Sequence, residues 1–97
     1  MPAEAVSTEV RDNPARHRYE LVVDGATAFV TYERQPGRVV LVHTEVPEAL
    51  AGKGVGSRLA RGALDSIRAL GMKIVPQCSF IARFVEKHPE YRDLLAS

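Results

Sequence analysis

The segment Ala51-Gly52-Lys53-Gly54-Val55-Gly56 separates two kinds of hydrophobic pattern and constrains the fold more than any other feature of the chain. Before this segment, residues 38–46 are rich in β-branched residues, and their apolar run at 39–42 is typical of a strand buried on both faces. After it, apolar residues recur every four positions from Val55 to Ile67, as they do on an amphipathic helix. The sequence therefore predicts a strand, a glycine-rich corner and a helix in direct succession.

Turn signals before this corner predict an antiparallel meander. Regular structure is expected to begin near Arg18, and Asp24-Gly25 is a strong hairpin signal between β-rich segments at 19–24 and 26–34. Gln35-Pro36-Gly37 predicts the next turn. Residues 1–15 show no sustained period, so we expect a flexible tail or a short edge segment there. The folded domain is then predicted to span residues 16–97.

The pattern after the corner predicts two helices and one more strand. The first helix, at about 54–70, is expected to end at Gly71, and residues 72–75 form a short strand. A second helix at 79–88 is ended by Pro89, with Phe80 and Phe84 predicted in the core. Because a strand–helix–strand crossover joins parallel neighbours, the predicted fold is α+β in the order β-β-β-α-β-α.

Composition narrows the classes of function. Hydrophobic residues make up 45% and charged residues 26%, as in soluble globular proteins, and the net charge of +1 gives no reason to expect nucleic acid. No apolar run reaches the ~18 residues of a membrane span. A single cysteine excludes an internal disulfide, and no Cys/His cluster has zinc spacing. We therefore expect a cytoplasmic domain without metal, membrane or nucleic-acid partners, as a monomer or weak dimer.

The glycines of the corner have two possible roles. They permit positive φ and let a ligand approach the main chain, and the first turn of the next helix offers unpaired N–H groups to a phosphate. Lys53 would add a positive charge. The spacing fits neither a Walker loop nor a G-x-G-x-x-G fingerprint. The alternative is a tight turn that only lets the helix pack closely.

The corner resembles motif A of the GNAT N-acetyltransferase superfamily, Gln/Arg-x-x-Gly-x-Gly/Ala, at Gly54 and Gly56, and departs from it at Ala51. The flanking sequences HTEVP (43–47) and PQC (76–78) are similar to a very small single-domain subgroup of that superfamily. The similarity extends from about residue 16 to residue 95.

This resemblance implies that acetyl-CoA is the cosubstrate. Its pyrophosphate would rest on main-chain N–H groups, and its pantetheine arm would lie where the third and fourth predicted strands splay apart, beside a bulge near 44–46. The implied coenzyme-binding residues are Thr44, Val46, Ala51, Gly52, Lys53, Gly54, Val55, Gly56 and Ser57.

Three side chains are candidates for the chemistry. Glu45 is the first choice for a general base, with an outward-facing salt bridge as the alternative. His43 lies on the same strand face and is a second possible base or a packing residue. Cys78 is a nucleophile, a group beside the CoA sulfur, or an inert buried side chain. Tyr91 is a further, weaker match to the thiol-protonating tyrosine of the family.

The resemblance thus implies direct acetyl transfer to an amine of a protein or a small molecule. Larger family members carry helices between their first two strands, whereas Asp24-Gly25 joins them directly here. We therefore expect an open acceptor surface. The alternative is a non-catalytic module that binds CoA or acyl-CoA, or regulates a partner.

Overall fold

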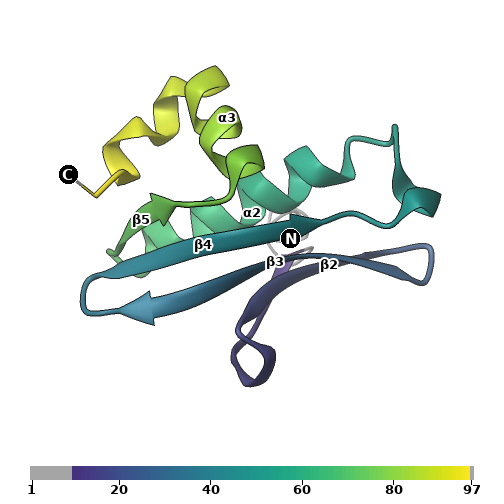
Figure 1. Ribbon diagram of the computed structural model, residues 1–97, viewed down its shortest axis with the longest axis horizontal. Coiled ribbons are helices and arrows are strands. Elements are labelled where there is room, and N and C mark those ends of the chain that lie inside the picture. Colours follow the sequence, from purple (N-terminus) through teal and green to yellow (C-terminus); the bar gives the residue numbers. More distant parts are fainter. Residues whose placement is uncertain (1–9, 97) are drawn as a thin grey trace, which may run out of the picture.

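The computed structural model describes residues 10–96, which form one five-stranded sheet with helices on one face (Figure 1). The strands lie side by side in chain order: β1 (Val10–Asn13), β2 (Arg18–Val23), β3 (Ala26–Gln35), β4 (Arg38–Glu45) and β5 (Lys73–Pro76). The first four are antiparallel, and β5 is parallel to β4. The helices are α2 (Val55–Ala69), α3 (Ser79–Lys87) and three 3-10 turns, η1 (Pro14–Arg16), η2 (Glu48–Leu50) and η3 (Pro89–Leu94).

The predicted α+β fold is confirmed, including the meander and the parallel crossover. Asp24 and Gly25 have φ of 51° and 80°, as a tight primed hairpin turn requires at both central residues. Gly71 has φ of 73° and follows the last residues of α2, as predicted.

Of the two alternatives for residues 1–15, the short edge segment is confirmed over residues 10–13, which form the edge strand β1. The flexible tail and the domain start at residue 16 are wrong for these residues. Its Val10 side chain is only 6% exposed, and the carboxylate of Asp12 accepts a hydrogen bond from the Tyr32 hydroxyl on β3. The pattern did not decide between the alternatives because Val10 is the single apolar residue of this strand. The domain therefore includes residue 10, while residues 1–9 lie outside the described range.

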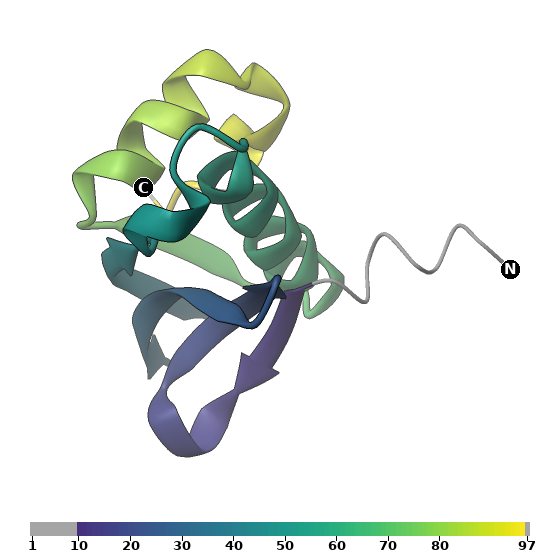
Figure 2. The same cartoon turned by 90° about the vertical axis from the view of Figure 1, so that its right-hand side faces the viewer.

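The core lies between the sheet and the two helices, which Figure 2 shows stacked over the same face of the sheet. Residues on alternate positions of β3 face the core as predicted, and Ala28, Val30 and Tyr32 are at most 3% exposed. Within residues 10–96, no helix covers the opposite face of the sheet. We call this the helix-free face; it carries Arg18, Glu20, Phe29, Thr31, Glu33, His43 and Glu45.

Two predictions about burial need correction. Phe84 is buried, but Phe80 is 38% exposed. Phe80 lies at the start of α3, and its ring is next to Gly56 in the first turn of α2. Burial on both faces of β4 holds only for residues 39–41, and Val42 is also 38% exposed.

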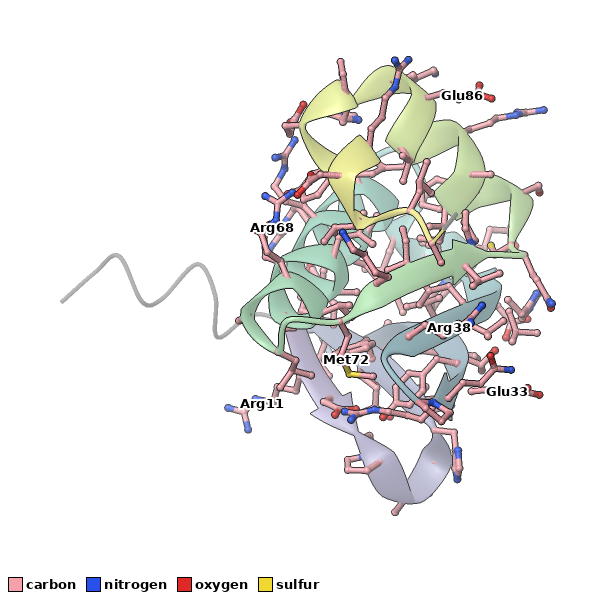
Figure 3. The ribbon with its side chains drawn as sticks, turned by 90° about the vertical axis from the view of Figure 1, so that its left-hand side faces the viewer. Arg11, Glu33, Arg38, Arg68, Met72 and Glu86 are labelled. Atoms are coloured by element: carbon pink, nitrogen blue, oxygen red, sulfur yellow. The ribbon has the colours of Figure 1, made fainter. Side chains whose placement is uncertain are left out.

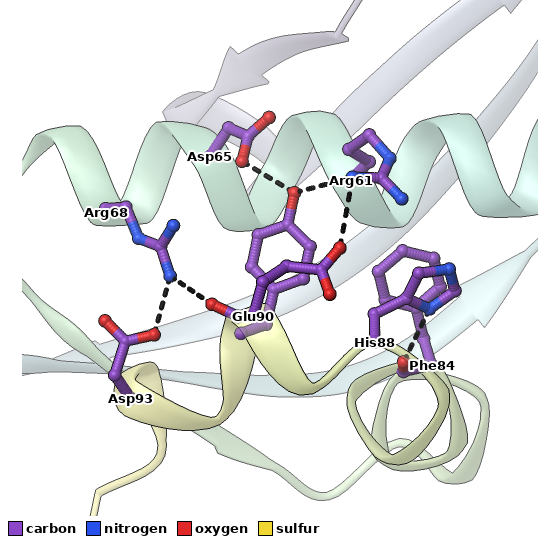
Figure 4. Close-up of polar contacts among 8 residues, drawn as sticks. Arg61, Asp65, Arg68, Phe84, His88, Glu90 and Asp93 are labelled. Atoms are coloured by element: carbon purple, nitrogen blue, oxygen red, sulfur yellow. Dashed lines mark hydrogen bonds and ion pairs between the residues drawn. The ribbon is translucent and has the colours of Figure 1, made fainter.

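Polar contacts attach η3 to α2 (Figure 4). The buried Tyr91 hydroxyl donates a hydrogen bond to Asp65 at 2.7 Å and accepts one from Arg61 at 3.3 Å. Arg68 donates to the Asp93 carboxylate at 2.7 Å. The Tyr91 hydroxyl is thus held by Asp65 and Arg61 in the middle of α2, and its thiol-protonating role stays a prediction.

We predict a specific alkaline loss of stability from Tyr91. Burial and the hydrogen bond to Asp65 raise the pKa of Tyr91 to about 12, above its ordinary value of 10.0. A raised folded-state pKa stabilises the fold fully below pH 10 and loses that effect as the pH rises toward 12. Urea unfolding from pH 8 to 11.5 should show Tyr91→Phe about 1 kcal/mol less stable at pH 8, with the gap closing above pH 10. If the stability of the two proteins changed in parallel with pH, this role of Tyr91 would be contradicted. The pKa values of Tyr19 and Tyr32 are also raised, but both tyrosines are present in the wild type and the variant and contribute equally.

Candidate functional site

Strands β4 and β5 separate halfway along β4. They pair only where residues 38–41 lie opposite 73–76, and β4 then continues to Glu45 while β5 ends at Pro76. The Cys78 N–H donates to the Leu41 carbonyl at 2.9 Å, after which the chain enters α3. Figure 1 shows β4 running on past the point where β5 turns upward. The predicted splay is thus present between the end of β4 and the start of α3.

A β-bulge in β4 decides which side chains face the splay. Thr31 lies opposite His43 and Tyr32 opposite Leu41, so Val42 is an extra residue. Alternation from the buried Leu41 would turn His43 and Glu45 toward the helices. The extra residue instead turns Thr44 inward, opposite the buried Val30. The bulge lies before the predicted position, because residues 44 and 45 pair regularly with β3.

The structure brings Thr44 and Cys78 together across the splay. The Thr44 hydroxyl and the Cys78 sulfur are 3.1 Å apart, and either atom can donate the hydrogen bond. Cys78 is 7% exposed and occupies the N-cap of α3 without a side-chain cap bond. A partly buried pair with one thiol and one hydroxyl therefore borders the opening.

His43 and Glu45 share the helix-free face, as predicted for one strand face. The His43 Nε2 and Glu45 Oε2 atoms are 3.9 Å apart, and the side chains are 60% and 61% exposed. Glu45 lies opposite Phe29 on β3, whose ring packs under the Arg18 guanidinium at 4.2 Å. The strand itself therefore separates these two candidates from Thr44 and Cys78.

The glycine-rich corner begins with η2, which the sequence pattern did not predict. Leu50 is 1% exposed and anchors this turn in the core. Gly52 and Gly54 then have φ of 80° and 71°, which side-chain-bearing residues rarely adopt. Gly54 is the N-cap of α2, which has neither a side-chain cap bond nor an acidic residue in its first turn. The positive φ of both glycines agrees with the prediction, and first-turn N–H groups of a helix lack intrahelical partners. The anion site itself stays a prediction.

Gly56 has a different explanation from the other two glycines. A Cβ added there would lie 3.0 Å from Cζ of the Phe80 ring, so Gly56 lets α2 and α3 pack closely. This contact supports the alternative of close helix packing for Gly56. Sequence reasoning missed Phe80 as a neighbour of the corner, because its helical spacing resembles that of a core residue.

The other predicted coenzyme-binding residues differ in exposure. Val55 is 1% exposed and can offer a ligand only its main chain, and Val46 packs partly against the core. The exposed members of this set are Ala51, Gly52, Lys53, Gly54 and Ser57, and Gly56 is half-buried. The Lys53 ammonium lies 3.5 Å from the carboxylate of Asp24, at the tip of the β2–β3 hairpin.

Residues 10–96 hold neither a cluster of metal-ligating side chains nor a helix that could span a membrane. No three His, Cys, Asp or Glu side chains gather there as metal ligands would. Neither helix in that range is long and apolar enough to cross a bilayer.

Comparisons with known proteins agree with this geometry. The family model described as GCN5-related N-acetyl-transferase matches residues 18–94. The chain is 31% identical over 91 residues to Protein NATD1 of Bos taurus, covering 91% of this chain and 80% of that protein. It is 32% identical over 83 residues to Protein NATD1 of Homo sapiens, covering 82% and 74%. The solution structure of a GCN5-like protein from Staphylococcus aureus, itself proposed to be an N-acetyltransferase, superposes with a TM-score of 0.70 at 27% identity, covering 92% of this chain and 88% of that one.

Proposed function

The chain belongs to the GCN5-related N-acetyltransferase family, and from that premise we propose that it transfers the acetyl group of acetyl-CoA directly to an amine. The observation that carries the proposal is the corner between β4 and α2. It combines two glycines at positive φ, a lysine and an uncapped helix N-terminus within a few residues. Such a corner suits a diphosphate, because main-chain N–H groups and the helix dipole both favour negative charge.

The splay supports the position of the thioester. Past Leu41, one edge of β4 no longer pairs with β5, and the Thr44–Cys78 pair borders this edge. A pantetheine arm that leaves the diphosphate at Gly54 can run along that edge like an additional strand. Its acetyl group would then lie near residues 44–46, where the N–H of Val46 is our candidate for polarising the thioester carbonyl.

The proposed chemistry needs a base on the acceptor side. A lysine-type amine has a pKa of about 10.4 and must lose a proton before it attacks. We propose that the Glu45 carboxylate accepts this proton directly or through water, with His43 as the alternative. The nitrogen then forms a bond with the acetyl carbon, the carbon–sulfur bond breaks, and CoA leaves as a thiolate that takes a proton.

The helix-free face supports a large acceptor. Glu45 and His43 are mostly exposed there, and no helix within residues 10–96 walls them in. An acceptor that supplies its own surface, such as a protein side chain or terminus, suits this face better than a small molecule that needs an enclosed pocket.

The same exposure favours a second candidate, a non-catalytic module that binds CoA or acyl-CoA, because a solvated carboxylate is a weak general base. Two measurements separate the candidates. Isothermal titration should detect binding of both acetyl-CoA and CoA, in preference to ATP. A screen of amine and protein acceptors should release free thiol only if the protein is an enzyme. Absence of heat with either form of the coenzyme would contradict both candidates.

We predict that Cys78→Ala retains acetyl transfer to within about fivefold. In direct transfer the thiol forms no bond to the acetyl group, and its loss removes one hydrogen bond and a small buried volume. The expected decrease in stability is about 1 kcal/mol. The readouts are kcat and the intact mass of the protein after incubation with acetyl-CoA alone.

Thr44→Val is the matched control for this experiment, since it removes the other partner of the contact and leaves the thiol in place. A loss of more than about 10³-fold in Cys78→Ala alone, with an acetylated wild-type protein in the mass spectrum, would replace direct transfer by a covalent intermediate.

A further inference from the structure

The tip of the β2–β3 hairpin contacts the glycine-rich corner, and that contact gives Asp24 a role that the corner alone does not suggest. Residues 24 and 53 are far apart in the chain, yet the Asp24 Oδ2 and Lys53 Nζ atoms are 3.5 Å apart. The contact exists because the short hairpin turn brings the ends of β2 and β3 level with the loop that follows β4. In Figure 1, the closed end of this hairpin lies below the loop that leads into α2.

Packing and hydrogen bonds hold the backbone in place on both sides of this ion pair. Asp24 and Gly25 form the two central residues of a tight turn with positive φ, and Val23 and Ala26 on either side pack against the core. On the other side, the buried Leu50 anchors the corner, and its carbonyl accepts a hydrogen bond from the Lys53 N–H at 3.3 Å. The two backbones therefore keep the carboxylate within reach of the ammonium, although both side chains are exposed.

We propose that Asp24 holds Lys53 in the free protein and competes with the coenzyme diphosphate for it, so that Asp24 lowers the coenzyme affinity. This inference rests on the proposed function. A diphosphate at the corner attracts the same ammonium that the carboxylate holds, and one ammonium cannot satisfy both anions equally. Binding therefore includes the release of Asp24 into water. Exposed ion pairs are weak, so the effect on affinity should be modest.

A double-mutant cycle tests this competition by isothermal titration with CoA at fixed ionic strength. We expect Asp24→Asn to bind CoA about threefold to fivefold more tightly than the wild type, and Lys53→Gln to bind it more weakly. The decisive comparison is Asp24→Asn in the Lys53→Gln background. With no ammonium to compete for, the added substitution should change Kd by less than about 1.5-fold.

Glu33→Gln is the control for net charge, since it removes one negative charge at the other end of β3. Glu33 is exposed and projects outward from the sheet in Figure 3, about 23 Å of strand away from the hairpin tip. We expect it to leave the Kd for CoA unchanged.

The outcomes separate this inference from the function on which it rests. An unchanged or weaker Kd in Asp24→Asn, while the wild type binds CoA, would overturn the competition and leave the function intact. Equal tightening in both backgrounds would overturn it as well, because it would show repulsion between Asp24 and the phosphates. No binding by the wild type would contradict the function and the inference together.

Discussion

Glu45→Gln is expected to lower kcat for acetyl transfer by about 10²–10⁴-fold, the usual contribution of a positioned general base. The amide keeps the shape of the side chain on the helix-free face but cannot accept a proton from the amine. The Kd for acetyl-CoA should remain unchanged, because β4 itself separates Glu45 from the Thr44–Cys78 side of the splay. Steady-state kinetics and isothermal titration on the same preparation measure the two quantities.

Two variants sharpen this prediction. Glu33→Gln removes a carboxylate elsewhere on the helix-free face and should retain full activity. His43→Gln tests the neighbouring imidazole, whose Nε2 lies 3.9 Å from the Glu45 carboxylate. Full activity in Glu45→Gln together with a large loss in His43→Gln would transfer the base role to His43. Full activity in both would remove side-chain base catalysis from this face.

Gly62→Ala is expected to destabilise the fold by about 1–3 kcal/mol, although alanine is the better helix former by about 1 kcal/mol. Gly62 lies in α2 where β1 passes beneath it. An added Cβ would lie 2.3 Å from Cγ2 and 2.6 Å from Cβ of Val10, so β1 must move. Urea unfolding measures the loss. Hydrogen exchange should locate it at residues 10–13.

The Val10→Gly background is the matched control for Gly62→Ala. Removing the Val10 side chain removes the three atoms nearest to the added methyl group, so we expect the helix-propensity gain of up to about 1 kcal/mol to prevail. The effect of Gly62→Ala on the free energy of unfolding should therefore be destabilising with Val10 present and stabilising in the Val10→Gly background. Equal destabilisation in both would show that β1 does not pack on α2 through this contact.

Local patterns were sufficient for most of the fold. Asp24-Gly25 predicted the hairpin, and the change of hydrophobic period at Gly52–Gly56 predicted the strand-to-helix corner, because both signals are complete within a few residues. For β1 the sequence left a flexible tail and a short edge segment as alternatives, since one buried Val10 makes no pattern. Its burial depends on Gly62, which lies far along the chain.

Less of the candidate site than of the fold could be predicted from the sequence. The positive φ of Gly52 and Gly54 could be expected, but the Phe80 contact of Gly56 and the Asp24 contact of Lys53 depend on tertiary packing. The position of the bulge was also missed, because it is a property of the register between β3 and β4. Alternation within β4 alone would have placed His43 and Glu45 beside Cys78.

The extra residue at Val42 determines which side of the sheet each side chain of the HTEVP segment faces. Removing it would restore simple alternation, so that every side chain downstream would exchange the two sides of the sheet. Glu45 and His43 would then face the side of the sheet on which Cys78 lies, and Thr44 would join the helix-free face. A relative could keep all five letters of this segment and still carry the opposite chemistry, if its chain were one residue shorter between Leu41 and the segment.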